Sequence, residues 1–146
     1  MEASELPEQL QQVRAHADSL GGLFDLMERN YLFVKDLDHR FCRCNRALWI
    51  ELGLKSESEM LGNTDADYFP PSLAKDYVDH DLRVIKSGKP ILGDIWLVPS
   101  QNSLRWYKIN KFPIFGESEG KGKLVIGVAG LMVPYEGAGS VPPEYE

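Results

Sequence analysis

The chain has 146 residues, which suits a single domain with one hydrophobic core. Its formal charge of −6 argues against nucleic-acid binding by this chain, because phosphates are neutralised by a surplus of Lys and Arg. No apolar run reaches the roughly 20 residues of a membrane helix, the acidic N-terminus is not a signal peptide, and Cys42 and Cys44 alone make neither a disulfide framework nor a metal site. We therefore expect a cytoplasmic protein with structural cysteines, no membrane contact and no metal.

The first predicted element is an amphipathic helix within a helical segment over residues 1–29. We expect it to pack through one apolar face, either on the outer side of a sheet or against a partner chain. That face repeats at the three- to four-residue spacing of a helix and consists of Leu6, Leu10, Val13, Ala17 and Leu20.

A β-hairpin is predicted next. Residues 30–36 are rich in β-branched and aromatic residues, and residues 40–44 alternate in polarity. The polar residues between them provide turn chemistry, so the two segments should pair. Asn45 follows as the expected N-cap of a helix that runs to Leu52.

Short helices and one longer helix fill the middle of the chain. Ser56 and Glu59 have the spacing of a capping box, and residues 64–69 predict a short turn or helix. Residues 72–86 predict the longer helix, because a Ser-Gly pair and Pro90 follow it.

Three more strands are predicted, over residues 91–98, 104–114 and 124–133. A hairpin, a helical crossover and a three-stranded meander make a five-stranded antiparallel sheet with helices on one face, an α+β fold. The tail after Pro134 is rich in Gly, Pro and Glu, which is typical of a linker.

Five motifs in this order resemble the PAS family over residues 31–133. They are FVKDLDHRF followed by CN, GNTDADYFP, Y-x-x-x-D-x-x-V-x-x-SGKP, RW-x-x-x-x-KFPI and VIGVAG. The resemblance implies a PAS fold, with short crossover helices on one face of the sheet and the amphipathic helix at the N-terminus. It divides the chain into a helical segment (1–29), a PAS sensor domain (30–134) and a linker (135–146) to a C-terminal effector outside this sequence.

The motifs KD-x-x-x-RF, GNTDADYFP and the tail GLMVPYEGAG are most similar to the N-terminal sensory domain of AraC-type transcription regulators. That resemblance implies a helix-turn-helix domain after the linker, and DNA contact only through that domain. Similar PAS domains precede histidine kinases and diguanylate cyclases, which remain alternatives.

Cofactors of other PAS subfamilies are not expected. The flavin-binding members carry a cysteine in the motif that corresponds to GNTDADYFP, and none is present here. The haem-binding members use a histidine on the long helix; His80 lies there, but between two aspartates it is expected to be solvated.

The resemblance and strand alternation together predict pocket residues on the inner face of the sheet. The same alternation predicts that Ile95 and Gly127 face inward. The candidate ligand-binding residues, most of which would equally suit a plain core, are Phe33, Lys35, Tyr77, Asp81, Leu97, Tyr107, Ile109, Lys111, Val125 and Ala129.

Three charged residues among these candidates need partners. Lys35 and Lys111 fall among apolar neighbours, where an ammonium must pair with an acid or an anionic ligand, or reach water. Asp81 lies in the apolar stripe of the long helix. We expect Lys111 and Asp81 to face the same interior space, either as a structural pair or as polar anchors of a pocket. Asp65 and Asp67 are expected to form caps and turns.

No nucleophile motif, phosphate-binding loop or metal-ligand spacing is found, so an enzyme is not expected. The leading hypothesis is a homodimeric sensor of an unknown small molecule. The alternative is a dimerisation module without ligand. A cavity of roughly 300 Å³ or more would favour the sensor, and a filled core the dimerisation module.

Overall fold

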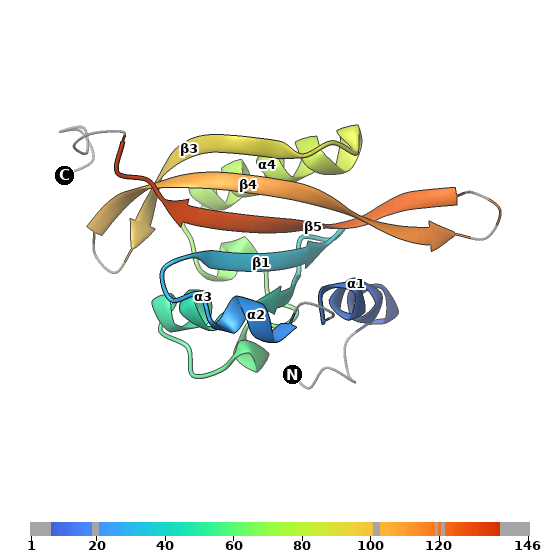
Figure 1. The fold of residues 1–146 in the computed structure, drawn as a ribbon, viewed down its shortest axis with the longest axis horizontal. Coiled ribbons are helices and arrows are strands. Elements are labelled where there is room, and N and C mark those ends of the chain that lie inside the picture. The colour runs from blue at the N-terminus through green and yellow to red at the C-terminus, as the bar shows by residue number, and fades with distance from the viewer. Residues whose placement is uncertain (1–6, 19–20, 101–102, 119, 121, 138–146) are drawn as a thin grey trace.

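The computed structural model describes residues 7–18, 21–100, 103–118, 120 and 122–137 (Figure 1). Their backbone forms one antiparallel sheet with the strand order β2-β1-β5-β4-β3, in which the predicted hairpin and the predicted meander are joined by the pairing of β1 with β5. The strands are β1 (Tyr31–Asp36), β2 (Phe41–Cys44), β3 (Ile91–Ser100), β4 (Ser103–Ser118) and β5 (Gly122–Pro134).

The helices join the two halves of this sheet or flank it. Residues 138–146 of the predicted linker lie outside the described residues. No described helix is long and apolar enough to cross a membrane. The helices are α1 (Glu8–Asp18), α2 (Gly21–Asp25), α3 (Arg46–Glu51), the 3₁₀ turns η2 (Glu57–Glu59) and η3 (Asp65–Asp67), and α4 (Pro71–Ser87).

Helix caps follow the sequence in part. The Asn45 side chain accepts from the Leu48 amide at the start of α3, as predicted, and its amide group donates to the carbonyl of Asn30 at 2.8 Å. Ser56 makes no side-chain cap, so the capping box predicted with Glu59 is wrong at that residue. A capping box forms instead one turn later, between Thr64 and Asp67.

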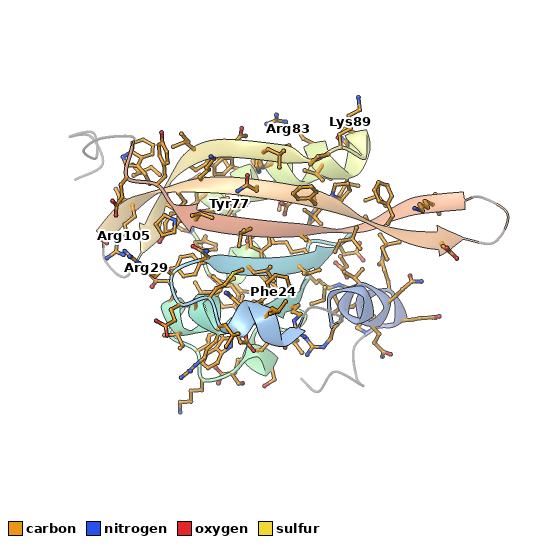
Figure 2. The ribbon with its side chains drawn as sticks, viewed as in Figure 1. Phe24, Arg29, Tyr77, Arg83, Lys89 and Arg105 are labelled. Atoms are coloured by element: carbon orange, nitrogen blue, oxygen red, sulfur yellow. The ribbon has the colours of Figure 1, made fainter. Side chains whose placement is uncertain are left out.

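The outer face of the sheet is covered by α1. Leu10 and Val13 are fully buried there against Leu32, Val34 and other apolar side chains, and Phe24 of α2 points toward the same layer (Figure 2). This confirms the first of the two packings predicted for the amphipathic helix. Leu6, Leu20 and the side chain of Ala17 lie outside what the structure describes.

Hydrogen bonds and an ion pair made by Arg14 hold α1 against the edge strand β2. The Arg14 guanidinium donates to the Cys42 carbonyl and to the Glu57 carboxylate, both at 2.8 Å. The other Glu57 oxygen accepts from the Cys44 amide. Both cysteines are free and buried, which confirms their structural role. The helix α1 therefore contacts the sheet through apolar packing and contacts the crossover segment through charge.

The inner face of the sheet carries the crossover, with α4 packed against β4 and β5. The second apolar cluster, around Phe33, Phe41, Leu48 and Met60, fills one end of this layer. Gly130 of β5 lies directly under the Phe33 ring, where any side chain would collide with it. The layer between the sheet and the crossover is therefore the place where an internal site can form.

Candidate ligand-binding site

A cavity of about 60 Å³ lies between the inner face of the sheet and the crossover helices. Its wall contains polar groups on β1, η3 and β4, together with Glu51 of α3 and aliphatic side chains. Six aromatic rings of the described residues also line it: Tyr31, Phe33, Phe41, Phe69, Tyr77 and Tyr107.

A network of four buried charges closes one side of the cavity. The Lys35 ammonium donates to Asp65 at 2.6 Å and to Asp81 at 2.8 Å. The second oxygen of Asp81 accepts from the Lys111 ammonium at 2.5 Å. All four residues are between 1% and 3% exposed. Two ammonium groups and two carboxylates thus share one water-excluded volume, and their formal charges cancel.

The number of partners decides which of the four groups holds its charge. Burial alone would raise the pKa of Asp81, but Lys35 and Lys111 outweigh it and hold that pKa below its usual range. Burial likewise opposes the ammonium of Lys35, and Asp81 and Asp65 together raise the Lys35 pKa nevertheless.

The two groups with a single partner behave in the opposite way. Burial raises the pKa of Asp65 beyond what Lys35 offsets. Burial lowers the pKa of Lys111, and Asp81 offsets only part of that effect. Asp65 and Lys111 are therefore the members of the network that most readily exchange protons or partners.

Tyr77 contributes a polar group without a partner. Its hydroxyl is buried and makes no hydrogen bond among the described residues. Its ring stacks on Trp96 and meets Phe69 edge to face, which fixes the side chain between α4 and the sheet (Figure 2). Burial raises its pKa, so the group is a neutral hydroxyl. An unsatisfied buried hydroxyl is costly, and a bound molecule with a matching group would remove that cost.

The structure brings most of the predicted residues together. Asp81 lies behind the cavity wall and holds both lysines, so the expected meeting of Lys111 and Asp81 is confirmed. The predicted residues that line the cavity are Phe33, Lys35, Tyr77, Tyr107, Ile109 and Lys111.

The inward assignment of Leu97 and Ile95 is wrong. Ile91 pairs with Lys111, but a bulge between Ile91 and Asp94 shifts the alternation of β3 by one residue. Beyond the bulge, Trp96 pairs with inward-facing Tyr107, and Val98 lines the cavity in place of Leu97.

The inward assignment of Ala129 and Gly127 on β5 is also wrong. Ala129 pairs with Val34 and packs in the α1 layer, and Gly127 faces Val13 of that helix. Val125 lies past a second irregularity in the sheet, and it faces the inner side together with its pairing partner Phe115, because Ile114 and Ile126 face α1. Val125 does not, however, line the cavity. The β5 residues on the cavity side are Val128, Gly130 and Met132.

Asp65 was missed as a site residue. It was expected to form a turn, and its neighbour Asp67 does so, but Asp65 is buried against Lys35. One signal in the sequence could have found it: two inward lysines require two acids, and Asp81 supplies one. The aromatic lining residues Tyr31, Phe41 and Phe69 were missed as well.

His80 is not solvated, contrary to expectation. It is 2% exposed, its Nε2 lies 2.9 Å from the Asp94 carboxylate, and its ring packs on Trp96. Burial first, and Lys111 second, lower its pKa. The described residues contain no cluster of His, Cys, Asp and Glu that could hold a metal ion.

Comparisons with known proteins agree with this architecture. The family model PAS_4, described as a PAS fold, matches residues 29–134. A search of curated protein sequences gave no significant match.

Solved structures of similar fold include a dimer of VqmA from Vibrio cholerae, described with LuxR-type receptors (TM-score 0.65, 21% identity, 88% of this chain and 54% of that chain). They also include VqmA bound to DPO (0.63, 22%, 84% and 58%). A third is the PAS domain of the quorum-sensing receptor RpfR from Cronobacter turicensis in complex with BDSF (0.55, 15%, 74% and 95%). The chain thus spans about half the length of the VqmA chains.

Proposed function

Because this chain belongs to the PAS_4 family of PAS folds, we propose that it is a sensory domain that binds a small molecule in the internal cavity and relays the event to an attached effector. The observation that carries the proposal is the chemistry of the cavity wall. Aromatic rings surround a few convergent polar groups, which is the composition of ligand pockets. The sequence contains no nucleophile motif, phosphate-binding loop or metal-ligand spacing, so we propose binding rather than catalysis.

The relatives support a binding role. VqmA has been solved with DPO, and the RpfR domain with BDSF, so domains of this fold take up small signalling compounds. For this chain we propose the same use of the fold, which is to bind a small molecule, and we propose neither of these two compounds as its ligand.

The proposed output is transcriptional. The tail and the first hairpin are most similar to AraC-type regulators, and VqmA is a receptor with target DNA. A helix-turn-helix effector after residue 134 is the form we propose, with a histidine kinase or diguanylate cyclase as the alternative. Either output would work as a homodimer, since paired effector domains are what a shift in a symmetric sensor dimer would reorient.

Native mass spectrometry of the chain purified from its own host tests ligand binding. We expect a non-covalent adduct of one small molecule per chain, released on acid denaturation. An adduct-free spectrum from cells grown under several conditions would count against the proposal. Light scattering of the chain with and without residues 1–22 tests the dimer: a dimer weakened by the deletion supports it, and a monomer at all concentrations contradicts it.

A ligand-free dimerisation module remains the second candidate, and the size of the cavity favours it. At about 60 Å³ the cavity is well below the roughly 300 Å³ expected of a pocket for a large ligand. A dimer that forms without any adduct would identify this second function.

A further inference from the structure

The charge balance of the buried network limits what the cavity can bind. Lys35, Lys111, Asp65 and Asp81 carry two positive and two negative charges in a water-excluded volume. The net charge of the four groups is zero, and it stays zero if a proton moves from one of them to another. A carboxylate or phosphate entering the cavity would leave uncompensated negative charge in a medium of low dielectric, which is strongly unfavourable. A neutral molecule avoids that cost.

The lysines themselves are not free to act as anion receptors. Lys35 already donates to two carboxylates and lies 4.9 and 5.0 Å from the ring centres of Phe33 and Phe41. Among the described residues Lys111 donates to Asp81 alone, so it keeps donor capacity for an uncharged acceptor such as a carbonyl oxygen. Glu51 in the same wall adds a further repulsion against anions.

The aromatic rings of the cavity wall and the Tyr77 hydroxyl further restrict which ligand fits. Rings of the wall meet one another at steep angles, as in the pair Phe33 and Phe41 at 85° and the pair Phe69 and Tyr77 at 88°. Edges and faces are thus both presented to the cavity, an arrangement that suits a flat ring. The Tyr77 hydroxyl requires a hydrogen-bonding partner on that ring. The small volume restricts the ligand to about one ring.

We propose, as an extension of the proposed sensory function, that the cavity selects an uncharged single-ring aromatic compound that carries a carbonyl-type acceptor and a second polar group, and rejects carboxylates of the same shape. Lys111 binds the acceptor, Tyr77 bonds the second polar group, and the balanced network excludes the anion. Asp65 sets the selectivity by balancing the charge of its partner Lys35 on β1.

The test uses matched probes of one shape: benzamide, benzoate and the non-aromatic cyclohexanecarboxamide. Their dissociation constants are measured at neutral pH by isothermal titration calorimetry and ligand-observed NMR. We expect benzamide to bind at least about tenfold more tightly than benzoate, and also more tightly than cyclohexanecarboxamide. Benzoate binding as tightly as benzamide would overturn the proposed ligand class while leaving the sensory function standing. Failure of all three to bind would also overturn the proposed ligand class, whereas the sensory function is overturned only if native mass spectrometry finds no adduct.

Two conservative variants sharpen the test. Asp65→Asn leaves two ammonium groups against one carboxylate, so benzoate should gain about tenfold relative to benzamide. An unchanged ratio contradicts the charge argument. Tyr77→Phe removes the unpartnered hydroxyl: the fold should keep or gain stability, while benzamide affinity falls about tenfold and toluene affinity does not change. A parallel loss for toluene would assign Tyr77 a packing role only and overturn its part in recognition.

Discussion

The two faces of the sheet are both buried, but the side chains that cover them differ in chemistry. The outer face is closed by apolar side chains of α1, with Leu10 and Val13 fully buried. The inner face buries a charge network beside a small aromatic cavity. Apolar closure stabilises without specifying a partner, whereas buried charge stabilises only when every group is matched. The outer face is therefore suited to hold the fold together, and the inner face to respond to a change in its contents.

Breaking the charge match should have the largest effect. Lys111→Met leaves Asp81 with one ammonium partner and should lower the free energy of unfolding by roughly 3 kcal/mol. Adding Asp81→Leu restores a matched pair of Lys35 and Asp65. The double variant should thus cost less than the sum of the two single changes, with a coupling of about 1 kcal/mol or more. Urea denaturation of the four proteins of this cycle measures it, and additive losses would show that the groups are independent.

An outer-face truncation should cost less and show no such coupling. Leu10→Ala removes buried apolar contacts of α1 and should lower the free energy of unfolding by about 2 kcal/mol. Exposed Gln12→Ala is the matched control on the same helix and should change stability by less than about 0.5 kcal/mol. A coupling between Leu10→Ala and Lys111→Met would break the distinction between the two faces.

Two glycines of β5 allow the faces to be tested by the same substitution. A Cβ at Gly130 would collide with the Phe33 ring on the cavity side, and one at Gly127 with the Lys35 carbonyl and Val13 on the α1 side. Each change to Ala should cost about 1–2 kcal/mol. Hydrogen exchange should show α1 loosened by Gly127→Ala and not by Gly130→Ala. Gly22→Ala, which has open space around its Cβ, is the neutral control.

The smallest expected effect is a pH dependence from His80. Burial, and then Lys111, lower its pKa from 6.5 in the folded state. Its contribution to stability is therefore present above the unfolded pKa near 6.5 and is lost as pH falls through the lowered folded value. His80→Gln should flatten the stability profile in that interval. Thermal melts of both proteins from pH 7.5 downward, about 0.5 unit apart, check this, and parallel profiles would contradict it.

The sequence correctly predicted the direction of side chains where the alternation of a strand or the spacing of a helix continued without interruption. On β4 the alternation of Tyr107, Ile109 and Lys111, and on α4 the helical spacing of Asp81, correctly predicted that an ammonium and a carboxylate meet. These predictions needed only the geometry of a strand and a helix.

The errors arose where the period is broken by a contact distant in sequence. The bulge at Gly93 is fixed by the Asn110 side chain, which accepts from the Gly93 amide at 2.9 Å, and the bulge reverses the faces of Leu97 and Val98. The sequence of β3 alone does not predict that hydrogen bond, because its acceptor lies on β4. Asp65 and Asp67 are likewise equivalent as sequence, and the capping box of Thr64 decides which carboxylate turns inward.

Gly127 has a consequence for how far a signal must travel. Because this residue lacks a side chain, Val13 of α1 packs against the strand at the peptide carbonyl of Lys35. The ammonium of that same residue lies in the charge network on the other side. In the proposed sensor, Lys35 thus joins the charge network to the packing of α1 through one residue. We therefore expect a ligand that moves Lys35 to alter the packing of α1 first.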